Sequence, residues 1–490
     1  MLAKIPRVYW AAVIIATVIG FYVYASLQRQ GVRSRGQSVS LLSGYDFGIP
    51  FARFAGVESL RSVSPKESKE LIAEIEKVIE QNGLPADVFY GLSSDVSREE
   101  RQQQQSNNIA VTLHMLFREY YEPPLDDPTR PPNEDLEKLW NASPVGAWDI
   151  NKETLDSVQN TLVPFEAKRQ FIRDELKDPD KHFYYIFERP DSLVLKSSSH
   201  RQTVVNTGAS KYLADYALLE EYVIAQALHD GNIHEAMEAL AYTFGIAFLA
   251  SQLADVGVRA DVAHVRLRAF DVLQRVVMDP KFERQHMVSL RNILLQKYQT
   301  RTPEQTAWFG DRADGMMKLH HIMMDGIGAL EPVELEWLKL RGAENDFRRR
   351  PRKYHEADML FFLQSMQKVI DVSNQPLLKR QDVFNQIHRE MRAKEHTYDK
   401  EGFALDPFVS GLRLKDVGDF MHLFAQDRSV LNRAIVAVLH SLGQGNTDNY
   451  RDPFTDKPYV VEQADGVLSI SAALLPRPFQ VPVFTEGEDY

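Results

Sequence analysis

Of the 490 residues, 44% are hydrophobic and 26% are charged, so the chain can bury a large core, and its length allows two or three domains at roughly 100–200 residues each. A formal net charge of −11 argues against nucleic acid as a partner, because phosphate contacts need an excess of Lys and Arg on one face. The lack of cysteine excludes disulfides, thiolate metal sites, a cysteine nucleophile and lipid attachment at an N-terminal cysteine.

The first predicted element is a membrane anchor within residues 1–27. No residue from 8 to 27 is charged, and a run of about 20 such residues matches the ~30 Å hydrocarbon core of a bilayer. Aromatic residues near both ends suit the membrane interface, namely Tyr9, Trp10, Tyr22 and Tyr24. The alternative is a cleaved signal peptide, because small residues stand near Ala25 and Ser26. We favour the anchor, since the apolar run exceeds the usual ~7–15 residues of a signal peptide.

Basic residues flank this segment on both sides. Lys4 and Arg7 precede it, while Arg29, Arg33 and Arg35 follow it. The rule that the cytoplasmic flank carries more Lys and Arg therefore does not decide its orientation. A short N-terminus before a long soluble domain favours export of that domain. Residues 28–63, which contain several glycines and little periodicity, are predicted to be a linker.

Residues 64–200 are predicted to form an N-terminal helical subdomain. Ser64-Pro65-Lys66-Glu67 combines an N-cap, a proline at the first helical position and a capping-box glutamate. A second capping box at Ser97–Glu100 opens a helix with an apolar face. The residues expected to be buried on that helix are Leu113, Leu116, Phe117 and Tyr120. Prolines between 122 and 135 interrupt the helical pattern, and shorter helices are predicted near 152–162 and 165–177.

Residues 201–443 are predicted to form a central domain of helical hairpins. Apolar periodicity indicates helices at about 209–230, 232–254, 258–278, 283–299 and 303–325, and further ones at 332–341, 352–372, 376–395 and 414–442. Short joints between consecutive helices favour antiparallel neighbours stacked side by side.

Residues 444–490 are predicted to form a small β element and a tail. The segments Tyr459–Gln463 and Val467–Ser471 flank Asp465-Gly466, a turn pair that favours a type I′ hairpin. The expected fold is therefore mostly α, with stacked antiparallel helical hairpins in an α-solenoid-like or irregular bundle. An N-terminal transmembrane helix and a C-terminal β-hairpin complete it.

The joint between two of the central helices carries a local resemblance. Gly231-Asn232-Ile233-His234-Glu235-Ala236 and the four residues after it resemble the inter-helix corner of a tetratricopeptide unit, where glycine makes the turn and alanine packs between the helices. Only this corner matches, and the chain has no 34-residue period.

A second resemblance concerns the C-terminus. Asp452-Pro453-Phe454-Thr455-Asp456-Lys457-Pro458-Tyr459, followed by the predicted hairpin, is similar to the end of a group of uncharacterised membrane-anchored bacterial envelope proteins. A related turn also occurs in type II secretion pseudopilins, but Asp456 stands where the envelope group usually has glycine, and residues 474–484 replace a Gly/Asp-rich tail. No pseudopilin calcium site transfers, and no catalytic residue is implied. The resemblance implies a bacterial inner-membrane protein with its soluble part in the periplasm.

The densest candidate metal cluster lies within residues 316–325. On a helix, Met316, His320 and Met324 share one stripe, and His321 lies on the adjacent one with Met317 and Asp325. Thioether and imidazole groups suit Cu(I), so these residues are a candidate copper site. The competing and favoured interpretation is that the methionines fill core space between helices.

Three other polar clusters have ordinary interpretations beside functional ones. His229, Asp230, His234 and Glu235 surround Gly231 and offer zinc ligands without the spacing of known zinc motifs. The basic run from Arg348 to Lys353 suits anionic lipid or an acidic partner, or is a solvated helix start. The Asn/Asp-rich loop from Asn446 to Asp456 is interpreted as a turn.

These features predict a single-pass envelope protein whose helical domain is an interaction or scaffolding module that binds the membrane through its N-terminal helix and a protein partner through its soluble part. No cofactor is expected. The alternatives are an envelope hydrolase whose acids come from separate helices, or a Met/His metal-handling protein. Neither the ligand nor any catalytic residue follows from the sequence.

Overall fold

The structure, a computed structural model, describes residues 107–484 with gaps at 118–119, 122–133, 143–151, 184–210, 254, 300–302, 309, 313–314, 316–325, 331, 350–351, 401, 445, 473 and 476. The predicted anchor, the linker, the helix beginning at Ser64 and the Met316–Met324 cluster lie outside these residues. No helix of the described residues is both long enough and apolar enough to cross a membrane.

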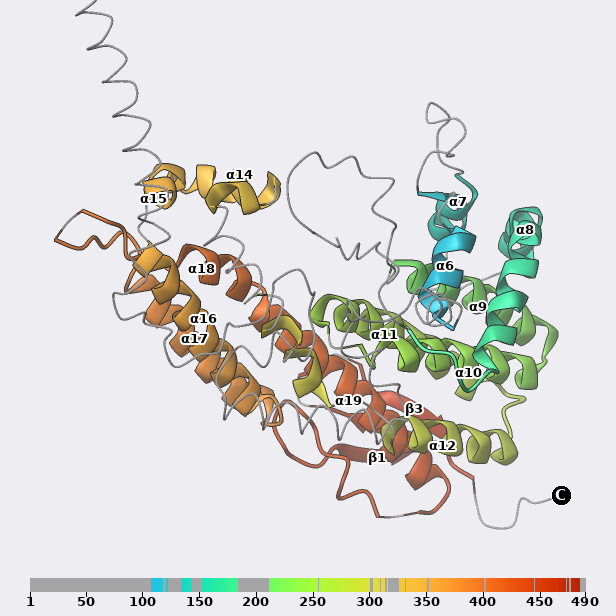
Figure 1. Cartoon of the computed structure of the whole chain (residues 1–490). Coiled ribbons are helices and arrows are strands. Elements are labelled where there is room, and N and C mark those ends of the chain that lie inside the picture. Colours follow the sequence, from blue (N-terminus) through green and yellow to red (C-terminus); the bar gives the residue numbers. More distant parts are fainter. Residues whose placement is uncertain are drawn as a thin grey trace, which may run out of the picture.

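The described chain is mostly helical and ends in a small antiparallel sheet (Figure 1). Its helices are α6 (Ile109–Phe117), α7 (Asp135–Asn141), α8 (Lys152–Leu176), α9 (Lys211–Asp230), α10 (Ile233–Ala250), α11 (Val256–Val277), α12 (Arg284–Gln299), α14 (Pro332–Leu340), α15 (Glu344–Arg349), α16 (Arg352–Val372), α17 (Leu377–Arg392), α18 (Phe408–Leu414) and α19 (Val417–Ser441), with a 3-10 turn η3 (Gly326–Ala329). The strands are β1 (Val460–Ala464), β2 (Val467–Ser471) and β3 (Phe479–Pro482).

Helix α9 is the centre of the first half of the fold. It packs against α8, α10 and α11, and α6 lies against both α8 and α9. The shared core includes Tyr212 and Tyr216 of α9, Leu113 of α6 and Phe165 of α8, all buried. Sequence-adjacent helices thus pack on one another, and the N-terminal helices close over α9 from the side opposite the C-terminal part of the chain (Figure 1).

Helix α19 joins the second half of the chain to the first. It packs against α11, α12 and α17, and strands β2 and β3 lie against it. Ile435 and Val438 of α19 share a core with Leu273 of α11 and with Ile470 and Val481 of the sheet. A separate cluster around Trp308, Phe362 and Phe424 holds α16 to α19. The C-terminal sheet therefore belongs to the main body of the fold.

The joint at Gly231 forms as predicted. Gly231 has φ +71°, a left-handed conformation that glycine adopts without steric penalty at the end of a helix. Its neighbour Asn232 caps α10, since the side-chain oxygen accepts a hydrogen bond from the Glu235 amide at 3.2 Å. This local chemistry ends α9 and begins α10 within two residues.

The predicted hairpin is also confirmed, with a third strand added. Asp465 and Gly466 have φ +51° and +76°, as a type I′ turn requires at both central residues. Val467 pairs with Ala464 across this turn, which fixes the register of β1 on β2. The sheet order is β1-β2-β3, so the tail contributes a strand that the sequence interpretation had not included.

One helix prediction needs correction. The helices expected near 152–162 and 165–177 are one helix, α8, with Pro164 inside it. Pro164 lies on the exposed side of α8, where water can replace the hydrogen bond that proline removes. The helix expected over 414–442 is confirmed as α19 (Val417–Ser441), and a short helix that was not expected, α18 (Phe408–Leu414), precedes it.

Candidate functional site

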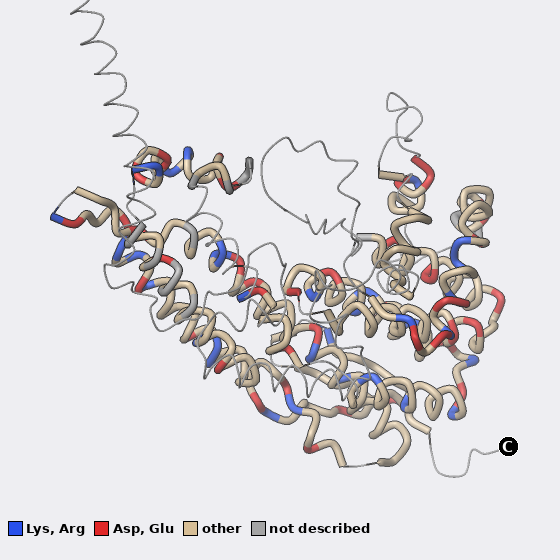
Figure 2. The backbone as a smooth tube through the Cα atoms, in the orientation of Figure 1, with Lys and Arg blue, Asp and Glu red and all other residues tan. Residues whose placement is uncertain are grey.

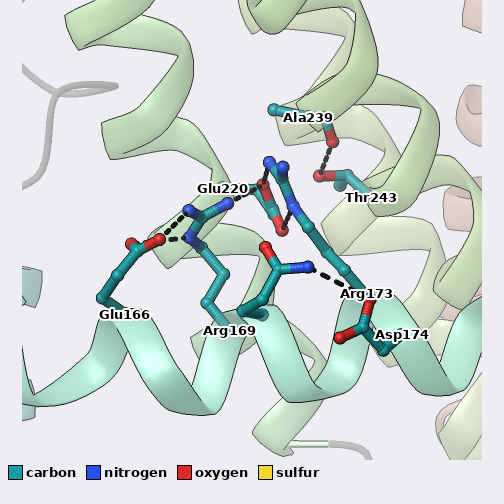
Figure 3. A network of polar contacts seen from close by, with 8 residues as sticks. Glu166, Arg169, Arg173, Asp174, Glu220, Ala239 and Thr243 are labelled. Carbon is teal, nitrogen blue, oxygen red and sulfur yellow. Dashed lines mark hydrogen bonds and ion pairs between the residues drawn. The ribbon is translucent and has the colours of Figure 1, made fainter.

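The inner face of α8 carries two arginines that converge on one buried glutamate of α9 (Figure 3). The guanidinium of Arg173 donates to both oxygens of Glu220, with Nε–Oε1 at 2.9 Å and Nη2–Oε2 at 2.5 Å. Arg169 Nη1 lies 3.6 Å from Glu220 Oε2, and its other nitrogens donate to Glu166 one turn earlier. We call Arg169, Arg173 and Glu220 the α8–α9 latch.

The latch is nearly closed to solvent. Glu220 has no exposed surface, and Arg169 and Arg173 are 7% and 6% exposed. Burial disfavours the charged form of Arg173, but the hydrogen bonds and charge of Glu220 outweigh it and raise the pKa of this guanidinium above its usual value. Arg173 also lies over the ring of Tyr242, 4.9 Å from its centroid. The ion pair is thus charged and enclosed.

A second carboxylate of α9 is held in the same way from the other side. Glu221, 4% exposed, accepts two hydrogen bonds from Arg268 of α11, at 2.5 and 2.6 Å. The Arg268 guanidinium lies 4.7 Å from the ring centroid of Trp140, a residue of α7. Adjacent glutamates of α9 therefore bind arginines of two different helices.

A third acid, Asp215, ties the N-terminal helices to the start of α9. It accepts from the indole nitrogen of Trp140 at 2.9 Å and from the hydroxyl of Tyr121 at 2.8 Å. Burial raises the pKa of Tyr121, and the neighbouring charge of Asp215 raises it further, so the phenol stays protonated and donates.

The buried glutamates of α9 hold neighbouring helices in place. Both oxygens of Glu220 and of Glu221 accept hydrogen bonds from arginine side chains, so neither carboxylate has an oxygen without a protein partner. A bidentate arginine–carboxylate pair fixes the relative geometry of the helices that carry it. The network orients α7, α8 and α11 around α9.

The opposite side of α8 exposes apolar side chains. Val163 and Phe171 are 67% and 51% exposed, and Ala167 between them is also exposed. Their spacing of four residues places them in one row along the helix. Met115 of the adjacent α6 is 74% exposed. We call Val163, Ala167 and Phe171 the α8 outer face.

Of the two candidate metal sites of the sequence, only the one at the Gly231 turn lies within the described residues. Met316, His320, His321 and Met324 lie outside them. At the Gly231 turn, Asp230 accepts from Gln226 and Glu235 accepts from Asn232. Among the described residues, no group of three or more His, Asp or Glu side chains is placed to hold a metal ion.

The other two polar clusters have local contacts. In the basic run, Arg348 pairs with Glu344 one turn away at 2.7 Å and remains half exposed. In the Asn/Asp-rich loop, Asp452 is buried and accepts from the Phe454 amide and the Thr455 hydroxyl, as expected of a turn. Asp456 has φ +60°, which explains why this position suits glycine.

Comparison of the chain with protein-family models, with curated proteins and with solved structures gives no match.

Proposed function

We propose that the protein is a membrane-anchored envelope scaffold whose α8 outer face binds an amphipathic helix of a partner protein. The observation that carries this proposal is the exposed row of Val163, Ala167 and Phe171. Val163 and Phe171 are both more than half exposed on one face of the helix, and clusters of exposed apolar side chains commonly mark interaction sites.

The geometry of the row favours a helical partner. Residues at a spacing of four form a ridge that fits the groove of a second helix, with the axes 8–10 Å apart as a typical value. Asp174, with its side chain 58% exposed, lies one turn beyond Phe171 along the same side of α8. We therefore expect the partner helix to carry apolar residues at i, i+4 and i+8 and a basic residue at one flank.

The latch supports this role from the inner side of α8. Because Arg169 and Arg173 are bound to Glu220, the helix is held in one orientation before a partner arrives. A surface fixed in its binding conformation loses less entropy when it binds, which increases affinity.

The membrane location and the arrangement of hairpins are part of the same proposal. The uncharged run from 8 to 27 supports a single inner-membrane anchor, and the resemblance of the C-terminus to envelope proteins supports periplasmic exposure. The direct packing of α9 with α10 and of α10 with α11, through short joints, supports stacked antiparallel hairpins in an irregular bundle.

Site-specific photo-crosslinking in cells tests the binding role. A benzophenone amino acid at position 171 should give a reproducible adduct of one defined mass. The same amino acid at Leu378, an apolar position of α17 with 52% exposure, is the matched control and should not give this adduct. Equal products at both positions, or none at position 171, would refute binding at α8.

The location is tested separately in the cysteine-free chain. Leu340, 82% exposed on α14, accepts a single reporter through Leu340→Cys. A membrane-impermeant maleimide added to intact cells with a permeable outer membrane should block this cysteine if the domain is periplasmic. Complete protection would place the domain on the other side.

A further inference from the structure

The two edges of the C-terminal sheet differ in whether their backbone groups are used. At the β3 edge, the side chain of Gln274 accepts from the Gln480 amide and donates to its carbonyl, both at 2.7 Å. The carbonyl of Pro482 accepts from the Ser441 hydroxyl at 2.6 Å, and proline has no amide hydrogen to leave free. The β3 edge is therefore closed by α11 and α19.

The β1 edge presents backbone groups that point away from β2. The type I′ turn makes Ala464 and Val467 a hydrogen-bonded pair. Because such pairs alternate along an antiparallel ladder, the backbone groups of Ala464, Glu462 and Val460 bond to β2. The amide and carbonyl groups of Val461 and Gln463 consequently face outward. Within the described part of the chain, none of the hydrogen bonds found uses them, and every residue of β1 is exposed.

The contacts of Gln480 at the β3 edge agree with this alternation of inward and outward backbone groups. Gln480 pairs with Ser469 in the β2–β3 register, and the same rule directs the Gln480 backbone groups outward. The hydrogen bonds to Gln274 lie where this rule puts them. The outward direction of Val461 and Gln463 follows from the same register.

A second copy of this chain is a poor occupant of the β1 edge. Symmetric antiparallel pairing that is confined to the residues of β1 and uses the outward groups of both Val461 and Gln463 centres on Glu462. It sets the two Glu462 side chains directly opposite each other in a non-hydrogen-bonded pair, with Cα atoms about 4.5 Å apart. Like charges at this position destabilise the pairing.

We propose that the β1 edge binds an extended segment of another protein as a fourth, antiparallel strand, with Lys or Arg opposite Glu462. The charge of Glu462 at the centre of the strand selects a cationic residue there. Val461 faces the same side of the sheet as its partner Ile470, which is buried, while Val461 is 37% exposed. An added strand with apolar residues beside the lysine would cover it. This surface is separate from α8 and does not depend on the proposed function.

Disulfide capture in the full chain tests the proposal, because the protein has no cysteine of its own. Ala464→Cys places a thiol two residues from Glu462 on the same face of the strand. The probe is the peptide Thr-Cys-Val-Lys-Val-Thr, whose lysine lies opposite Glu462 when its cysteine lies opposite position 464. The matched competitor has glutamate in place of lysine, and both are mixed in a redox buffer.

The proposal predicts that the lysine peptide is captured about threefold to tenfold more than the glutamate peptide, the range expected of an opposite-charge against a like-charge pair. Glu462→Lys should reverse the preference. Capture should slow hydrogen exchange at the amides of Val461 and Gln463 and leave that of Glu462 unchanged, since the last already binds β2. Val461→Pro, which removes one outward amide and no bond to β2, should reduce capture.

Equal capture of the two peptides, or capture without protection of the Val461 and Gln463 amides, would overturn the proposal. So would self-association of the unmodified protein that protects these amides, because it would show a second copy at the edge. If Val461→Pro left capture unchanged, thiol reactivity alone would account for the product. Circular dichroism confirms that each variant is folded before capture is scored.

Discussion

Arg173 and Glu220 form a bidentate ion pair between α8 and α9 in which the carboxylate has no exposed surface. The pair is 47 positions apart in sequence and joins the N-terminal helices to the rest of the fold. The orientation of α8, and with it the direction of Val163 and Phe171, depends on this contact.

Removal of one partner of the latch should destabilise the protein strongly. Glu220→Gln leaves the nearly buried guanidinium of Arg173 without its counter-charge, so we expect a loss of about 3–5 kcal/mol in the free energy of unfolding. The double variant Glu220→Leu with Arg173→Leu should lose much less stability than the sum of the losses of the single variants Glu220→Leu and Arg173→Leu. The double variant removes both members of the ion pair, whereas each single variant leaves the other member buried without it. Urea unfolding measures both, and Lys177→Ala, at an exposed position just after the end of α8, is the control. Additive losses would contradict a coupled pair.

Two glycines should respond to alanine in opposite directions. Gly231→Ala forces a residue with a Cβ into φ +71° and should lose on the order of 1 kcal/mol. Gly245 lies inside α10 with nothing within 4 Å of an added Cβ, so Gly245→Ala should gain about 0.5–1 kcal/mol from helix propensity. Thermal unfolding of the two variants checks this, and a gain at Gly231 would show that the joint is not held in the left-handed conformation.

Lys297 should make stability depend on pH in the alkaline range. Burial against Phe248, with Nζ 4.8 Å from the ring centroid, lowers the pKa of this lysine below its usual value. Between the lowered pKa and the ordinary one, the unfolded chain binds more protons than the folded one, so stability from this group rises with pH. At neutral pH the buried charge opposes folding.

Lys297→Met keeps the apolar contact with Phe248 and removes the charge. The variant should be more stable than the unchanged protein at pH 7, and the difference should shrink as pH rises through the lowered pKa towards 10.5. Urea unfolding in steps of one pH unit from 7 to about 10 measures this. A difference that stays constant with pH would mean that the lysine titrates normally in the fold.

Loss of the side chain that closes the β3 edge should expose a second free edge. Gln274→Ala removes both hydrogen bonds to Gln480, and we expect a loss of about 1–2 kcal/mol because the backbone groups of Gln480 are then open to water at the margin of the sheet. The variant should also self-associate more readily, since open strand edges pair with other chains. Analytical ultracentrifugation checks the second effect; Gln285→Ala on α12 is a polar control and should not self-associate.

Elements set by local chemistry were predictable from the sequence. The end of α9 at Gly231, the cap at Asn232 and the turn at Asp465-Gly466 each depend on residues within a few positions of one another. The expected helix over 352–372 coincides with α16. The third strand was missed, although Phe479, Val481 and Val483 alternate with other residues there and offered a period-two signal.

The candidate site was not predictable in the same way. In sequence, Glu220 and Glu221 look like the polar face of an amphipathic helix, and nothing local shows that arginines of α8 and α11 reach them. Similarly, Phe171 fits an apolar pattern that normally faces a core, and only the packing of α8 shows it turned outward. Burial of a charge depends on distant partners, so it appears only when the helices are placed. Figure 2 shows acidic and basic positions interspersed along the described helices.

If the latch presents the α8 outer face to a partner helix, the photo-crosslinking yield at position 171 should differ between the protein with the latch intact and the Glu220→Gln variant. We expect one defined adduct in the first protein and a large loss of it in the second, with no such adduct from position 378 in either. The same yield at position 171 in both proteins, or matching products at positions 171 and 378, would contradict this expectation.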